Sequence, residues 1–123
     1  MKKALSATVI VAMLLGGYAY ADCGYPKPPE KIPDGNTATL QDMLAAQKMI
    51  KAYNDEIKAY TDCLRSEHDA AIAKADPAKI TKEQRAELDK VLVQKNDAAV
   101  DEATAVTNRF NEQVRAFKAK GQK

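Results

Sequence analysis

Few side chains in this sequence have the chemistry for catalysis or metal binding. There is one histidine, His68, and there are two cysteines, Cys23 and Cys63. Any histidine-based triad must use His68, and Ser66 does not support it because residues two apart on a helix point in different directions. The five glycines are scattered along the chain, so no glycine-rich phosphate loop is present. The sequence therefore predicts no catalytic residue and no enzyme.

Metal and haem sites need ligands that converge, and the candidate ligands here are far apart. At least 19 residues separate His68 from Met43 and from Met49. His68 lacks the Glu three residues earlier that di-iron bundles use, and no Cys-x-x-Cys-His motif for covalent haem occurs. We therefore expect no cofactor and no metal site, with Met43 in the core and His68 exposed beside Glu67 and Asp69.

The first 21 residues have the pattern of a secretory signal peptide. Two lysines at positions 2 and 3 precede a short apolar run over 7–15, and Ala19-Tyr20-Ala21 supplies small residues for cleavage after Ala21. An uncleaved N-terminal anchor is the alternative. Asp22, directly before Cys23, does not fit a lipidated cysteine. The sequence predicts a periplasmic or secreted protein.

The charge balance gives no support for nucleic-acid binding. The full chain has 19 Lys+Arg and 17 Asp+Glu. Cleavage after Ala21 removes two lysines and no acid, so the remaining chain has equal numbers of both signs. We therefore expect no nucleic-acid partner.

Two stretches show apolar residues at helical spacing. The stripes predict helices over about 39–75 and 82–118, with Asp76-Pro77 ending the first helix because the residue before proline is disfavoured in helical geometry. A basic tail after Lys118 is expected to fray. The stripe residues are Met43, Ala46, Ile50, Tyr53, Ile57, Tyr60, Leu64 and Ala71 in the first helix, and Leu88, Leu92, Ala99, Ala103, Val106, Phe110, Val114 and Phe117 in the second.

Both predicted helices begin with a capping box. Thr39 is followed three residues later by Asp42, and Thr81 is followed three residues later by Gln84. The short connection makes the helices antiparallel neighbours. We therefore predict an all-α, antiparallel two-helix hairpin over 39–123, preceded by a Pro-rich extended segment over 22–38 and the signal peptide over 1–21.

The Pro-rich segment and the cysteines together predict a strap. Four prolines among residues 23–33 favour extended polyproline II. Two cysteines in an exported chain most simply form one disulfide, Cys23–Cys63, and an intermolecular disulfide is the alternative. The lengths agree, at about 35 Å of helix from residue 40 to 63 and about 31 Å of polyproline II from 23 to 33. The strap would run antiparallel along the first helix, with Tyr25 near Tyr60.

Apolar residues outside the stripes indicate a partner. Such residues are Leu44, Ile72, Val91, Val93 and Val100. We expect a homodimer that forms a four-helix bundle, or a partner protein in the envelope. The candidate interaction surface consists of four aromatic side chains on the stripes, namely Tyr53, Tyr60, Phe110 and Phe117.

Two classes of function fit these features. The first is a non-enzymatic exported protein that acts through protein–protein interaction and is chaperone-like or envelope-associated. In outline it resembles the small periplasmic helical chaperones and stress proteins, although it lacks their Leu-Thr-x-x-Gln pair. The second is a helical bundle that binds a small ligand, metal, haem or lipid. Residues 109–123 carry a net charge of +4, which complements the helix dipole or, as the less favoured alternative, contacts a membrane surface.

Overall fold

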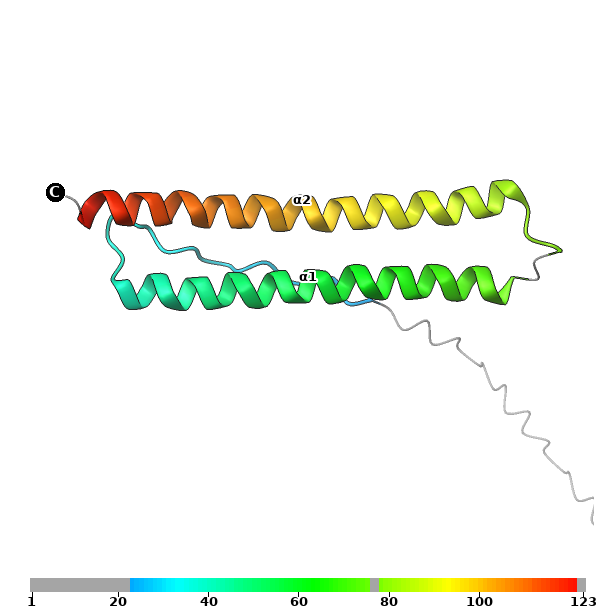
Figure 1. Cartoon of the computed structure of the whole chain (residues 1–123), viewed down its shortest axis with the longest axis horizontal. Helices are drawn as coiled ribbons and strands as arrows, with labels where there is room; N and C mark the ends of the chain where they lie inside the picture. The colour runs from blue at the N-terminus through cyan, green and yellow to red at the C-terminus, as the bar shows by residue number, and fades with distance from the viewer. Residues whose placement is uncertain (1–22, 76–77, 122–123) are drawn as a thin grey trace, which may run out of the picture.

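Two long antiparallel helices make up most of the protein (Figure 1). The computed structural model describes residues 23–75 and 78–121. Helix α1 spans Leu40–Lys74 and helix α2 spans Lys82–Gly121. The described residues contain no β-strand, so the prediction of an all-α hairpin is confirmed. The predicted signal peptide and its predicted cleavage site lie outside the described residues, as do Asp76 and Pro77. Helix α1 ends just before them, at Lys74, and Ala75 is already extended.

Both helices begin at the predicted capping boxes. The Thr39 hydroxyl accepts a hydrogen bond from the Asp42 amide at 3.1 Å, and the Asp42 carboxylate accepts one from the Thr39 amide at 2.9 Å. Thr81 and Gln84 make the same reciprocal pair at 3.0 and 3.1 Å. Each box satisfies amide groups that the first helical turn would leave without partners, which fixes where each helix starts.

Helix α2 is longer than its sequence predicted. The expected fraying after Lys118 is wrong, because α2 continues to Gly121. The Lys120 ammonium donates a hydrogen bond to the Ala38 carbonyl at 2.8 Å and lies 4.9 Å from the centre of the Phe117 ring. These contacts tie the last turn of α2 to the start of α1, and a cation there also complements the helix dipole.

The core lies along the seam between the helices. The buried side chains follow the predicted stripes for most of their length. The stripe residues that are only partly buried lie at both ends of the seam, with Ala71, Leu88 and Leu92 toward the interhelical connection and Val114 and Phe117 near the end of α2. The buried core residues of the two helices are Met43, Ala46, Ile50, Tyr53, Ile57, Tyr60 and Leu64 in α1, and Ala99, Ala103, Val106 and Phe110 in α2.

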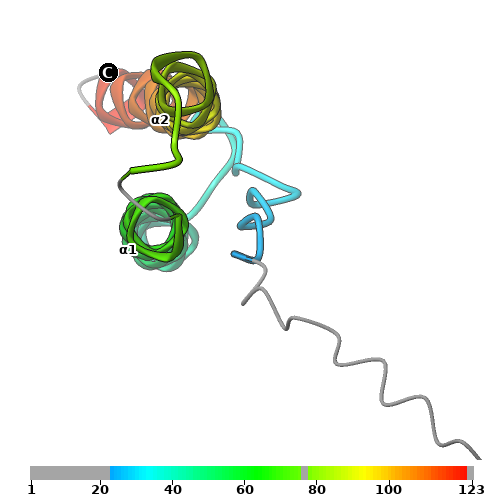
Figure 2. The same ribbon diagram turned by 90° about the vertical axis from the view of Figure 1, so that its right-hand side faces the viewer.

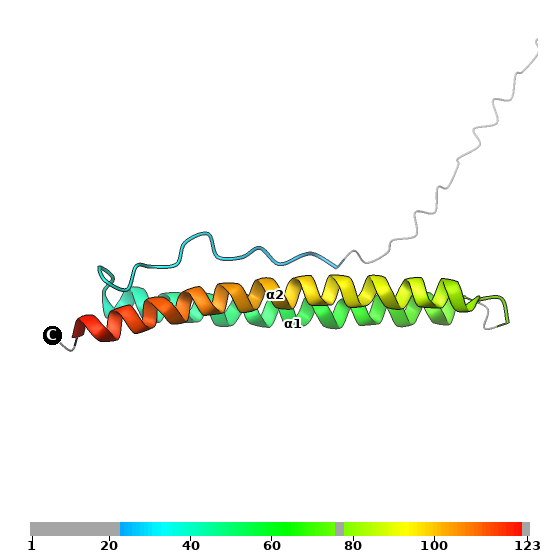
Figure 3. The same cartoon turned by 90° about the horizontal axis from the view of Figure 1, so that it is seen from above.

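The N-terminal segment, residues 23–38, lies to one side of the helix pair. Figure 2 shows it beside both helices, and Figure 3 shows it running along them. It ends in a turn, where the amides of Thr37 and Ala38 donate to the Asp34 carbonyl at 3.1 and 2.8 Å. The Asp34 carboxylate also accepts from the Asn36 amide at 2.9 Å. This turn reverses the chain into α1.

Candidate functional site

The disulfide between Cys23 and Cys63 joins the start of the N-terminal segment to the middle of α1. The two Cα atoms are 5.8 Å apart, and the bond closes a loop with a sequence separation of 40 residues. The predicted intramolecular pairing is therefore present in this structure. Both sulfur atoms are used in this bond, so neither offers a thiolate nucleophile.

Tyr25 attaches the N-terminal segment to both helices. Its ring packs edge-on against Tyr60 of α1 with ring centroids 5.1 Å apart, which is the neighbour that the sequence predicted. Its hydroxyl donates a hydrogen bond to the Glu102 carboxylate of α2. This bond, with a smaller contribution from burial, raises the pKa of Tyr25 to about 12. The phenol is therefore neutral over the physiological pH range.

Gly35 brings the other end of the segment into direct contact with α2. Its amide donates a hydrogen bond to the Gln113 side-chain oxygen at 2.9 Å. A Cβ atom added at Gly35 would lie 2.0 Å from the Gln113 carbonyl oxygen and 2.8 Å from the Phe117 amide nitrogen. The backbone therefore approaches α2 as closely as only a glycine permits.

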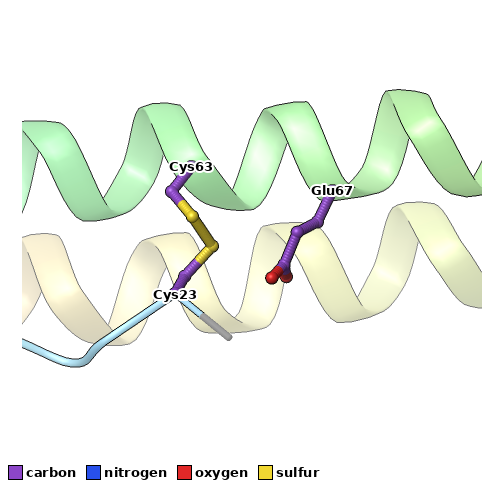
Figure 4. A group of neighbouring side chains, drawn as sticks. All are labelled: Cys23, Cys63 and Glu67. Atoms are coloured by element: carbon purple, nitrogen blue, oxygen red, sulfur yellow. A yellow bond between two sulfur atoms is a disulfide. The ribbon is translucent and has the colours of Figure 1, made fainter. Parts of the chain in front are cut away.

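Glu67 lies next to the disulfide. It follows Cys63 by one helical turn on α1, and its carboxylate points toward the two sulfur atoms (Figure 4). One carboxylate oxygen and both sulfur atoms lie within 4.8 Å of one another, and all three residues are partly buried. Among the described residues, this is the group of Cys, His and acidic side chains whose ligand atoms lie close enough to share a metal ion.

The His68 side chain links α1 to α2 near the loop that joins the two helices. Its Nε2 lies 2.6 Å from the Asp89 carboxylate of α2, and its Nδ1 lies 3.1 Å from the Asp69 carboxylate. The imidazole is 14% exposed, so the expectation of an exposed His68 is wrong. The hydrogen bond to Asp89, followed by that to Asp69, raises the pKa of His68 above its ordinary value. A protonated His68 can donate to both carboxylates and so holds α1 against α2.

The four aromatic residues of the predicted interaction surface lie mostly in the core. Tyr53, Tyr60 and Phe110 are 3%, 8% and 8% exposed, and Phe117 is partly buried against the same cluster. The Tyr53 hydroxyl has no hydrogen-bond partner among the described residues. Burial, and then the negative charge of Glu102, raise the pKa of Tyr53. Within one chain these rings pack the hairpin and do not form an exposed patch.

Some of the exposed apolar side chains lie on the side of the helix pair away from the N-terminal segment, which we call the open face. Three adjoining hollows run along it between α1 and α2, and no residue of the N-terminal segment lines them. The largest is about 550 Å³ and has a mainly apolar lining. Leu40, Leu44 and Val100 line the hollows while remaining 60%, 49% and 44% exposed. The rim includes Lys48 and Lys51.

Comparisons with known proteins add no family assignment. No family model, no curated protein and no solved structure matches this chain. Neither of the two described helices has a stretch that is long and apolar enough to cross a membrane.

Two of these contacts were not predicted from the sequence, although it contained indications of both. Glu67 follows Cys63 by four residues, and such residues are neighbours on a helix. The antiparallel register that places Leu64 opposite Leu92 also places His68 opposite Asp89. Leu64 and Leu92 do line a common hollow, together with Glu67 and His68.

Proposed function

We propose that this protein is a non-enzymatic, exported helical protein that acts by protein–protein interaction through its open face. The observation that supports this function is the group of exposed apolar side chains that line the hollows of that face, with Leu40 and Leu44 at one end and Val100 at the other. Apolar side chains are costly to leave in water, and an exposed apolar patch is typical of a docking site. A chaperone-like or envelope-associated role follows from such a surface together with the predicted signal peptide.

The occupant that we propose for the open face is a second copy of the chain. Each copy has two parallel rows of groove-lining residues on adjacent helices, so two hairpins that meet face to face form a four-helix bundle. Small residues, Ala103 and Thr104, line the hollow nearest the interhelical connection and allow close approach of another helix. A two-fold pairing also buries the same apolar side chains on both copies at once.

A sedimentation experiment with matched variants tests the dimer. We expect the wild-type chain to sediment as a dimer, and Leu44→Glu together with Val100→Glu to weaken dimerisation at least about tenfold, since a buried unpaired carboxylate is strongly unfavourable. Met49→Glu is the control, because Met49 is 46% exposed but lines none of the three hollows. A wild-type chain that remains monomeric at several hundred micromolar would contradict the proposal.

A second candidate function is the binding of an anionic amphiphile in the groove. Lys48 and Lys51 line one hollow and Lys118 lines the next, above an apolar floor that includes Ile50 and Phe110. An acyl chain on the floor and an acidic head group at the lysines would match this arrangement.

Native mass spectrometry of the protein from its exported fraction separates the two candidate functions. A dimer without added mass favours protein interaction, and a stoichiometric lipid, metal or haem favours ligand binding.

The N-terminal segment has a supporting role in this proposal as a strap that holds the hairpin together. Its contacts are distributed over both helices, at Cys63 and Tyr60 of α1 and at Glu102 and Gln113 of α2. A two-helix hairpin alone buries little apolar surface, and small domains commonly need such a staple. By covering one side of the seam, the strap leaves the open face as the surface for the partner.

A further inference from the structure

The group formed by Cys23, Cys63 and Glu67 has the composition of a metal site. Two of its members lie one turn apart on α1, and Cys23 is brought to them from a distant part of the chain (Figure 4). Cysteine sulfur and carboxylate oxygen are both established zinc ligands. While the sulfur atoms are bonded to each other, the Glu67 carboxylate oxygen lies within 4.8 Å of both. The Cα atoms of Cys23 and Cys63 are 5.8 Å apart, a separation that also lets two thiolates bind one ion.

The oxidation state of the cysteines decides whether this site exists. In the disulfide the two sulfur atoms are bonded to each other and supply no thiolate. A dithiol reductant transfers two electrons and two protons to the disulfide, becoming a cyclic disulfide itself and leaving two protein thiols. Metal binding then displaces one proton from each thiol. Thiolate ligands are therefore available only in the reduced chain.

We propose that the reduced protein binds one thiophilic divalent cation, for which Zn²⁺ is the probe, through Cys23, Cys63 and Glu67. Three protein ligands leave the fourth position of a tetrahedral ion for water. The cation also removes an electrostatic conflict, since two thiolates beside a carboxylate would repel one another. Metal binding thus favours the thiolate form of both cysteines.

The bound ion replaces the disulfide as the connection between the N-terminal segment and α1. Reduction alone releases Cys23 from Cys63 and leaves the segment attached by contacts such as Tyr25 with Tyr60. A metal held by residues 23, 63 and 67 closes the same loop again. Because a site assembled from distant residues forms only in the folded chain, its binding free energy adds to folding stability.

The test is a Zn²⁺ titration of the full chain without its leader, reduced and then freed of reductant under anaerobic conditions. Thiol counting first verifies two free thiols per chain. A competing chromophoric chelator then gives affinity and stoichiometry. We expect one Zn²⁺ per reduced chain, no comparable binding to the oxidised chain, and at least about tenfold weaker binding to Glu67→Gln, in line with the loss of one ligand.

The matched control is Glu56→Gln, which removes the same charge from an exposed position on α1 outside the group. It should bind Zn²⁺ as the wild type does. Melting followed by circular dichroism adds an independent measurement, in which Zn²⁺ raises the melting temperature of the reduced wild type more than that of Glu67→Gln. If reduction unfolds the chain, recovery of helix on adding Zn²⁺ to the wild type but not to Glu67→Gln supports the site.

Three results would contradict the proposed metal site. They are equal affinities for Glu67→Gln and wild type, equal binding by oxidised and reduced chains, and one ion shared between two chains. Each is independent of the proposed dimer, because none of the three residues of the metal site lines the hollows of the open face and the sedimentation experiment is run without reductant, on the oxidised protein. Failure of one proposal therefore leaves the other standing.

Discussion

The disulfide divides the hairpin into two halves that differ in packing. The covered half comprises residues 40–64 of α1 and 99–121 of α2, and it contains all the buried residues of both helices. The turn half comprises residues 65–75 and 78–98, and none of its described residues is fully buried. The N-terminal segment reaches as far as Cys23, where the buried core also stops. The N-terminal segment thus acts as a third layer, although it contains no helix or strand, and the buried core is found where this layer covers the helices.

The largest expected effect on stability comes from removing the disulfide that separates the two halves. Replacing both Cys23 and Cys63 by serine should lower the free energy of unfolding by about 4 kcal/mol, because the unfolded chain regains the entropy of a loop of 40 residues. Urea denaturation measures this loss. Hydrogen exchange should show the covered half losing protection toward the level of the turn half. A loss below about 1 kcal/mol would mean that other contacts hold the segment.

Truncation of one apolar side chain in each half tests the difference in packing. Ile57→Ala in the covered half should lower the free energy of unfolding by about 2–5 kcal/mol, since Ile57 is buried and leaves a cavity. Leu88→Ala in the turn half should cost much less, because Leu88 is only partly buried and loses less transfer free energy. Equal losses in chemical denaturation would remove the distinction between the halves.

Two glycines of the N-terminal segment test how much its close contact with α2 contributes to stability. Gly35→Ala should destabilise the protein by about 1–3 kcal/mol, since the new Cβ would overlap the backbone of α2 at Gln113 and Phe117. Gly24→Ala is the control, because nothing lies within 4 Å of its added Cβ. Thermal melts of both variants measure the difference. A Gly35→Ala melt that matches Gly24→Ala would show that the segment can move away from α2 without cost.

The smallest expected effect is a pH-dependent contact in the turn half. The folded pKa of His68 is raised above its ordinary value of 6.5, chiefly by its hydrogen bond to Asp89. A raised folded pKa means that the contribution to stability is fully present below the unfolded pKa and is lost as pH rises through the folded value. The melting temperatures of wild type and His68→Gln should therefore differ most near pH 5 and converge at alkaline pH. A difference that is independent of pH would exclude this charge effect.

The sequence predicted the elements whose causes are local. Capping boxes and helical periodicity both depend on residues within one or two helical turns, and both appear in the structure. The end of α2 could not be placed, because its stability depends on Lys120 reaching the Ala38 carbonyl, 82 residues away in sequence. Local propensity contains no information about such a contact.

The candidate interaction surface was harder to predict, because it depends on which side of the helix pair the N-terminal segment covers. Tyr53 and Tyr60 lie on an apolar helical stripe. Such a stripe shows that its side chains are buried, but not whether a partner protein or another segment of the same chain buries them. The N-terminal segment covers their side and leaves Leu44 and Val100 exposed on the other. Glu67 and His68 were missed for a related reason, since the roles of both depend on residues from other segments.

The position of the disulfide also simplifies oxidative folding. The chain has two cysteines, and both are in the bond, so a single intramolecular pairing exists and no shuffling between isomers can delay folding. A chain that emerges N-terminus first exposes Cys23 early, but Cys63 follows only after 40 more residues, by which point most of α1 is available. The rate of covalent closure is then set by the oxidant and by chain encounter. Formation of the bond reports directly that the N-terminal segment has reached the middle of α1.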